Sequence, residues 1–336
     1  MKPVSAIAAL CGAALACWAA VAPAQEVTLI FATTTATFQP PAPQILHPWA
    51  ARINEVGKGV VQIEVRDGPA IASPQNFYDR VQNDVVQVAW GVQGSVGVFP
   101  LTDVARLPYI AGKGEHGAVA FWRLYKTGLL DTEYRDVHPI EFGAFPQTLV
   151  HLAKPPRSVE DYEGLRLIAN SKIAAEAISK LGATPATFLI QEAYSALQRR
   201  TVDGIVTGYP GLPPFKLQEV TTAHIGVRMG GGMSFMLMAR KKFDSLPAAA
   251  QKVIDDNSGE PLSRKHGAFN DSEDLRTRAI LNAMPGQAIV EPTAAQHEMF
   301  RRRLAPAVEE WVRTTPGGEA VLASYRELLA KVQQEF

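Results

Sequence analysis

Residues 154–204 read KPPRSVEDYEGLRLIANSKIAAEAISKLGATPATFLIQEAYSALQRRTVDG. The spacing of apolar residues in this segment alternates between the period of a strand and the period of a helix. It predicts, in order, a strand at residues 166–169, a helix at 172–181, a helix near 191–200 and a strand at 205–207. Gly182 and Asp203-Gly204 stand where the chain must turn between these elements. The segment therefore predicts a strand–helix repeat of an α/β protein.

The same alternation occurs before this segment. It predicts strands at residues 27–31, 61–65 and 85–90, helices that begin at Pro48 and that carry Phe77 and Val81, and extended chain from 141 to 153. Strands separated by helices indicate βαβ units and a largely parallel sheet. Because the alternation repeats after residue 140, we expect two α/β lobes. No low-complexity linker separates them in the sequence, which is typical of lobes that bend about a hinge around a cleft.

The last hundred residues are predicted to be mostly helical. One helix begins at Pro247. Apolar stripes with three- and four-residue spacing then run from Phe300 to Trp311 and from Leu322 to Val332. We therefore expect a helical C-terminal region to follow the two lobes.

Charge and composition exclude some partners. The 336 residues contain 33 Lys and Arg against 33 Asp and Glu, so the formal net charge is zero. No basic excess is present to neutralise phosphates, which argues against nucleic acid or an anionic membrane as the main partner. The hydrophobic fraction of 47% and the charged fraction of 20% are those of an ordinary globular protein.

The first 24 residues have the pattern of a signal peptide. Lys2 precedes a nearly continuous apolar stretch from residue 7 to residue 21, and Ala22-Pro23-Ala24 places small residues at the cleavage positions. An uncleaved membrane anchor is the alternative. Both cysteines, Cys11 and Cys17, lie in this segment, so the exported protein is predicted to contain no disulfide and no thiolate site. We expect a periplasmic protein cleaved near Ala24.

The sequence carries no recognisable catalytic motif. Gln93 occupies the position where a Gly-x-Ser-x-Gly nucleophile elbow around Ser95 needs its first glycine. His297-Glu298 begins like a zinc-binding helix, but Arg301 stands where the second histidine is required. Gly230-Gly231-Gly232 lacks the lysine and hydroxyl of a phosphate loop and is interpreted as a turn or a permissive crossover between lobes. We predict no enzyme activity, no cofactor and no metal.

An ordered series of motifs runs through the chain after residue 24. It comprises Trp49 with Gly57-Lys58-Gly59, Phe99-Pro100-Leu101, Leu107-Pro108-Tyr109, Lys154-Pro155, Asp161 to Arg166, Leu181 to Pro185, Glu192 to Gln198, Val202-Asp203-Gly204 and Phe243 to Pro247. The series resembles the DctP family, the solute-binding proteins of tripartite ATP-independent periplasmic (TRAP) transporters.

This resemblance implies a two-lobed α/β periplasmic binding protein fold with a ligand cleft between the lobes and a helical C-terminal region. Residues 25–148 and about 234–270 are expected to form lobe 1, and residues 149–233 and about 271–336 to form lobe 2. The implied function is capture of a small organic solute and its delivery to a small and a large integral membrane subunit, without hydrolysis. A sensor-type binding protein and a periplasmic enzyme on the same fold are the alternatives.

The resemblance also implies which residues line the ligand pocket. Carried over position by position, these residues are Thr34, Trp90, Gly91, Thr148, Ile168, Ser171, Ile190, Thr207 and Tyr209. Packing within a strand or loop is the alternative role for each of the hydroxyl residues, and a core position is the alternative for Trp90.

Ile168 departs from the family pattern, which normally places a carboxylate-binding arginine at this position. Isoleucine donates no hydrogen bond, so a carboxylate facing it has no counter-charge. Two readings remain open. In the first, which the sequence favours, the ligand is neutral, aromatic or weakly polar and lies against Trp90, Ile168 and Ile190. In the second, the ligand is an organic acid held by hydroxyls, backbone amides or an arginine from elsewhere, such as Arg106.

Overall fold

The computed structural model describes residues 26–93 and 97–336. The predicted signal peptide and its two cysteines therefore lie outside the described residues. Within the described ranges, no helix combines the length and apolarity needed to cross a membrane.

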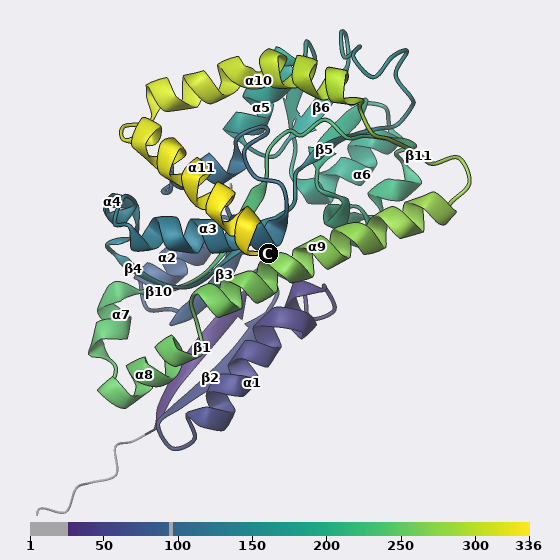
Figure 1. Ribbon diagram of the computed structural model, residues 1–336. Coiled ribbons are helices and arrows are strands. Elements are labelled where there is room, and N and C mark those ends of the chain that lie inside the picture. Colours follow the sequence, from purple (N-terminus) through teal and green to yellow (C-terminus); the bar gives the residue numbers. More distant parts are fainter. Residues whose placement is uncertain (1–25, 94–96) are drawn as a thin grey trace, which may run out of the picture.

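The first lobe is built on a five-stranded sheet (Figure 1). Its strands, in spatial order, are β2 (Val61–Asp67), β1 (Val27–Thr33), β3 (Val88–Val92), β10 (Gly232–Ala239) and β4 (Val137–Phe145). One face is covered by a π-helical turn (Ala42–Leu46), α1 (His47–Val56), α7 (Arg240–Ser245) and α8 (Ala248–Asp256). The other face is covered by α2 (Phe77–Gln82), a 3₁₀ turn η2 (Thr102–Arg106), α3 (Gly114–Lys126) and α4 (Asp131–Tyr134). Each face thus has its own hydrophobic core.

The second lobe is built on a six-stranded sheet. Its strands, in spatial order, are β11 (Ala288–Val290), β9 (Ala223–Ile225), β5 (Leu149–Leu152), β8 (Gly204–Thr207), β6 (Arg166–Ala169) and β7 (Thr184–Thr187). The helices α5 (Lys172–Lys180) and α10 (Ala294–Thr314) cover one face, and α6 (Ile190–Gln198) covers the other. Three 3₁₀ turns, Tyr209–Gly211 (η3), Pro213–Phe215 (η4) and Leu217–Glu219 (η5), lead from β8 to β9.

The prediction of a largely parallel sheet was only partly right. β1 pairs in parallel with β2 and β3, and β6 pairs in parallel with β7 and β8. β10, however, is antiparallel to β3 and β4, and β5 is antiparallel to β8 and β9. The reason is that β4 and β9 end where the chain passes between the two sheets, whereas β5 and β10 begin there, so β10 runs opposite to its neighbour β4 and β5 runs opposite to its neighbour β9.

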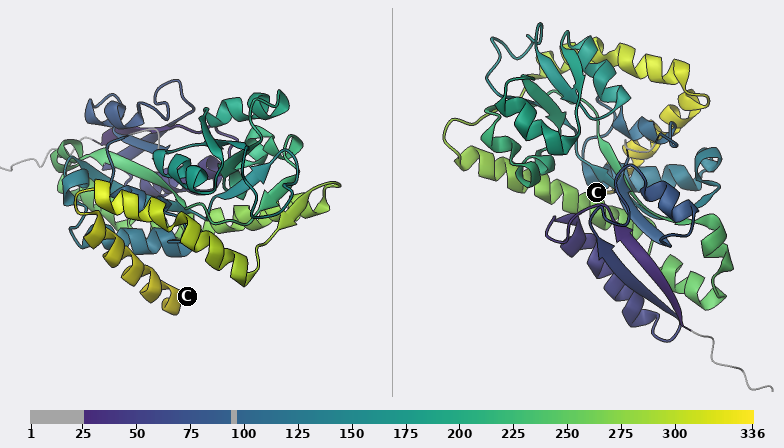
Figure 2. Two further views of the ribbon diagram at one scale, coloured as in Figure 1. Left: turned by 90° about the horizontal axis from the view of Figure 1, so that it is seen from above. Right: turned by 180° about the vertical axis from the view of Figure 1, so that it is seen from behind.

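Two helical segments join the lobes. The 24-residue helix α9 (Glu260–Ala283) packs on α3 and β4 of the first lobe and on η3 and β11 of the second (Figures 1 and 2). α10 packs on α5, whereas α11 (Gly318–Glu335) packs on α3, with Val321, Tyr325 and Val332 in a core of the first lobe. The expectation that all of residues 271–336 belong to the second lobe therefore fails for α11, because its apolar stripe faces α3.

Candidate functional site

Two short segments carry the chain between the sheets and lie side by side. The Thr148 N–H donates to the carbonyl of Gly230 at 2.6 Å, and the Met229 N–H donates to the carbonyl of Thr148 at 2.9 Å. In open α/β folds, ligands bind beyond the carboxyl ends of the strands, and β4 and β9 both end beside this crossover. A ligand site is therefore expected in the surroundings of this crossover.

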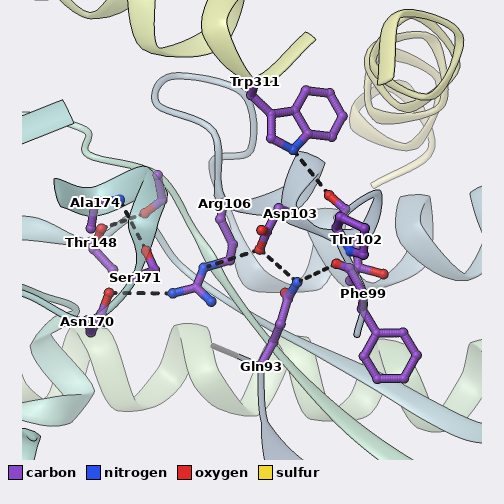
Figure 3. Close-up of polar contacts among 12 residues, drawn as sticks. Gln93, Phe99, Thr102, Asp103, Arg106, Thr148, Asn170, Ser171, Ala174 and Trp311 are labelled. Atoms are coloured by element: carbon purple, nitrogen blue, oxygen red, sulfur yellow. Dashed lines mark hydrogen bonds and ion pairs between the residues drawn. The ribbon is translucent and has the colours of Figure 1, made fainter. Parts of the chain in front are cut away.

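A buried arginine lies beside the crossover. Arg106, the last residue of η2, is 7% exposed. Its Nη2 donates to Oδ1 of Asn170 at 3.5 Å, and its Nε lies 4.0 Å from Oδ1 of Asp103 (Figure 3). Arg106 belongs to the first lobe, whereas Asn170 follows β6 of the second. The guanidinium therefore bridges the two lobes.

The guanidinium has spare hydrogen-bonding capacity. It carries five N–H donors, yet its contacts among the described residues are the long hydrogen bond to Asn170 and the 4.0 Å ion contact with Asp103. Burial lowers the pKa of Arg106 and Asp103 opposes this shift, but a guanidinium stays charged at neutral pH. The site thus holds a buried cation whose donors are mostly free for an incoming anion.

Asp103 and Gln93 complete the cluster on the first lobe. The Nε2 of Gln93 donates to Oδ1 of Asp103 at 2.8 Å, the same oxygen that Arg106 approaches. Burial raises the pKa of Asp103, and Arg106 lowers it. Trp311 of α10 also reaches the first lobe, where its Nε1–H donates to the carbonyl of Pro100 at 3.1 Å (Figure 3).

Gly230 fixes the position of Arg106. A Cβ on Gly230 would lie 1.8 Å from the carbonyl oxygen of Arg106, and the φ of Gly230 is +114°, which side-chain-bearing residues rarely adopt. The backbone of η2 can pack against the crossover only because this residue is glycine. The structure agrees with the interpretation of the triple glycine as a permissive crossover.

Two of the four predicted hydroxyl residues form hydrogen bonds with the backbone. Oγ1 of Thr148 donates to the carbonyl of Gly230 at 2.7 Å, and Oγ of Ser171 caps α5 by accepting from the Ala174 N–H at 3.1 Å (Figure 3). Thr207 is 6% exposed at the end of β8, and Thr34 is partly exposed after β1. Thr148 lies near Arg106 because it bonds to Gly230, which packs against the Arg106 backbone. Ser171 lies near Arg106 because it follows Asn170, which accepts a hydrogen bond from the guanidinium.

The predicted apolar residues lie in hydrophobic cores. Trp90 stacks on His266 with ring centroids 6.2 Å apart, and Ile168 packs in the core beneath α6. Tyr209 is fully buried, with its ring edge against His151. A Cβ on Gly91 would lie 2.5 Å from the ring of Phe77, so this glycine makes room for core packing. Ile190, the first residue of α6, is partly exposed.

Sequence reasoning did not identify Gln93, Asp103 or Asn170 as site residues, and it named Arg106 only as an alternative anchor. One signal was available. Arg106 is a cation within the apolar run Val104-Ala105-Arg106-Leu107, which predicts either burial with a counter-charge or a functional role.

Other potential sites lie elsewhere. Two surface cavities of about 240 and 310 Å³ lie on the first lobe, one beside Trp49 and Lys265 and one beside Trp122 and Lys126, and neither is lined by residues of the Arg106 cluster. Across residues 26–93 and 97–336, no three His, Cys, Asp or Glu side chains gather closely enough to hold a metal ion.

Comparison with known proteins agrees with this architecture. Residues 31–314 match the model of a family described as bacterial extracellular solute-binding protein, family 7. The chain is 25% identical over 272 residues to the outer membrane transporter protein TsaT of Comamonas testosteroni, covering 79% of this chain and 80% of that protein. It is 23% identical over 291 residues to the C4-dicarboxylate-binding periplasmic protein DctP of Rhodobacter capsulatus, covering 82% and 84%.

Solved structures share the fold. A TRAP solute-binding protein from Rhodoferax ferrireducens, in complex with copurified benzoate, superposes with a TM-score of 0.84 at 24% identity, covering 92% of this chain and 99% of that one. A marine metagenome TRAP solute-binding protein specific for aromatic acid ligands, in complex with 3-hydroxybenzoate, gives 0.84 at 22% identity, with coverages of 92% and 99%. Because the family model spans most of the chain, this protein belongs to bacterial extracellular solute-binding protein family 7, the TRAP-transporter solute-binding proteins.

Proposed function

We propose that this solute-binding protein captures a small organic acid, aromatic in class, and holds its carboxylate on Arg106. The observation that carries the proposal is the buried guanidinium at the boundary between the lobes, most of whose donors have no partner among residues 26–93 and 97–336. A carboxylate accepts two parallel hydrogen bonds from a guanidinium, and each charge-assisted bond contributes about 1.5–3 kcal/mol.

The cost of burying Arg106 supports an anionic ligand. A buried charge without a close counter-ion is unfavourable, and Asp103 compensates Arg106 only from 4.0 Å. An anion that binds the remaining N–H groups of Arg106 beside Asn170 would supply the missing contacts and would also bridge the lobes. Such a ligand would favour the closed arrangement, because it contacts both lobes only there.

This proposal reverses the preference drawn from Ile168 alone. Ile168 is 1% exposed and lies in a hydrophobic core, and its side chain has no hydrogen-bond donor. Arg106 supplies the cation from another element instead. The aromatic class is supported by the similar structures, which hold benzoate or 3-hydroxybenzoate. The alternative is a neutral aromatic solute held against Ile190 and the hydroxyl residues, and titration with a neutral aromatic compound distinguishes the two.

The remaining parts of the function follow from family membership. We infer that the protein acts outside the cytoplasm after cleavage near Ala24, and that it hands its ligand to a small and a large membrane subunit. It catalyses no reaction in this role. The closed, ligand-bound form, in which the ligand contacts both lobes, is the form that would dock on these subunits.

Calorimetric titration tests the ligand class. Benzoate, mandelate and succinate are compared with benzamide, which has the shape of benzoate without its charge. We expect at least one acid to bind and benzamide not to bind. We expect Arg106→Gln to weaken that acid about 100-fold, which corresponds to about 3 kcal/mol.

Arg135→Gln is the matched control, because Arg135 is 75% exposed on the first lobe and its ion contact is with the neighbouring Asp136. It should leave the affinity unchanged. Binding of benzamide as tight as that of benzoate, with no effect of Arg106→Gln, would establish the neutral-ligand reading instead.

A further inference from the structure

Beside Arg106 lies a buried acceptor for which the described residues provide no partner. Gln93 directly follows β3. Its side chain packs within the first lobe, and only 6% of the residue is exposed. Its Nε2 donates to Asp103 at 2.8 Å and to the carbonyl of Phe99 at 3.4 Å. Its Oε1 is buried and accepts no hydrogen bond from the described part of the chain. A buried carbonyl oxygen left in this state costs about 1–3 kcal/mol.

The orientation of this amide is fixed by its neighbour. A carboxylate can only accept hydrogen bonds, so the amide nitrogen must face Asp103 and the oxygen must point elsewhere. The Phe99 carbonyl is likewise an acceptor and favours the same orientation. Rotating the amide by 180° would place two oxygens against each other. The unpartnered acceptor is therefore a consequence of the local hydrogen bonding.

The acceptor belongs to the same cluster as the cation. Gln93 Nε2 and Arg106 Nε both approach Oδ1 of Asp103, from 2.8 Å and 4.0 Å (Figure 3). One carboxylate oxygen thus lies between the guanidinium and the amide, whose own oxygen has no partner among the described residues. A ligand that satisfies both would carry an anionic group and, a few bonds away, a hydrogen-bond donor.

We infer that Gln93 is a specificity-determining residue, which selects carboxylic acids that also carry a hydroxyl or amino group. This inference rests on the proposed function, since it requires the carboxylate on Arg106. The ligand donor hydrogen-bonds to Gln93 Oε1 and removes the penalty of its burial. An acid without the donor leaves that oxygen unpaired in the closed protein and is therefore bound less tightly.

The experiment measures a ratio of affinities. Protein recovered from the periplasm of an expressing bacterium is titrated with benzoate and its three hydroxy isomers, and with phenylacetate and mandelate. For wild type, we expect at least one hydroxylated acid to bind about tenfold more tightly than its parent, as one hydrogen bond to a buried acceptor implies. In Gln93→Leu the ratio should fall to about one, while the affinity for the parent acid stays within about twofold.

Gln82→Leu is the control. Gln82 ends α2, and its amide donates to the carbonyl of Asp136 on the surface. It should keep the wild-type ratio. If Gln93→Leu does not fold, Gln93→Met is used instead, because methionine is unbranched and similar in length to glutamine. Persistence of the preference for the hydroxylated acid in a folded Gln93 variant would overturn the inference, as would the absence of any such preference in wild type.

The two proposals fail in different ways. If no carboxylic acid binds wild type, or if Arg106→Gln is without effect, the proposed function is wrong. If acids bind and need Arg106, but hydroxylated and unsubstituted acids bind equally, only the role of Gln93 is wrong.

Discussion

Gly230 is the residue on which the position of the buried cation depends. Any side chain there would have to move η2, because its Cβ would lie 1.8 Å from the Arg106 carbonyl oxygen. We predict that Gly230→Ala lowers the free energy of unfolding by about 3 kcal/mol, from the positive φ and the backbone overlap together. Urea denaturation followed by circular dichroism measures this loss.

Gly68→Ala separates the two causes. Gly68 also has a positive φ, +86°, but no atom lies within 4 Å of the point that a Cβ on this residue would occupy. It should cost only about 1–2 kcal/mol, which is the effect of the backbone conformation alone. Equal losses for the two variants would show that η2 adapts to the new side chain without resistance.

The site residues could be predicted from the sequence only in part. Ile168 was singled out as unable to bind a carboxylate, because this follows from its chemistry alone. Arg106 and Asn170 are 64 positions apart, and no local periodicity links them. Gln93 could not be identified from the sequence, because its role depends on the hydrogen bond to Asp103 that fixes the orientation of its amide. Trp90 and Tyr209 were named because they stand at pocket positions that the family resemblance implies, but aromatic residues also fill cores.

The elements themselves were predicted well where their hydrophobic patterns are strong. The strand at 166–169 coincides with β6, and the helix predicted at 172–181 differs from α5 by one residue. The directions of β5 and β10 were missed, because the hydrophobic pattern shows which faces of a strand are buried but not the sheet to which the strand returns. The assignment of α11 failed for a related reason. Its apolar stripe is plain in the sequence, but the partner of that stripe, α3, lies about 200 residues earlier (on the order of one whole domain).

The pairing of β5 with β9 creates a pH dependence. His151 and His224 face each other across these strands, with their Nδ1 atoms 2.8 Å apart, and Nε2 of His151 lies 3.1 Å from the carbonyl of Thr207. Burial, and secondarily His224, lowers the pKa of His151 to about 3. The unfolded chain takes up this proton near pH 6.5. The stability contributed by neutral His151 is therefore present above pH 6.5 and is lost as the pH falls from 6.5 toward 3.

We predict that His151→Gln reduces this acid sensitivity. Glutamine can also donate and accept, but it does not titrate. Between pH 6.5 and 4.5, wild type should lose up to about 1.4 kcal/mol per pH unit more than the variant. The comparison with the variant is needed because buried carboxyl groups change the stability with pH in the opposite direction. Burial raises the pKa of Glu133 to about 7, for example, so its contribution to stability falls as the pH rises. Parallel stability curves for the two proteins in urea would rule out a titration at His151.

At the scale of the whole molecule, the two lobes are joined by more than the crossover. α9 packs on both sheets, and the chain passes from α10 on the second lobe to α11 on the first. Trp311 of α10 reaches a core of the first lobe and donates to the carbonyl of Pro100. These connections should make the lobes unfold together, even though each has its own cores.

The tryptophans allow this cooperativity to be measured. Four of the five lie in the described residues, and Trp49, Trp90, Trp122 and Trp311 all pack in the cores of the first lobe. Their fluorescence therefore reports on that lobe, whereas far-ultraviolet circular dichroism reports on the helices of both. We predict coincident urea midpoints for the two signals, as two-state unfolding requires. A ligand on Arg106 and Asn170 should shift both midpoints equally, because it stabilises only the folded molecule with both lobes in place. A fluorescence midpoint that differs from the circular dichroism midpoint would show that the lobes unfold separately, and that α9 and α10–α11 act as tethers without coupling them.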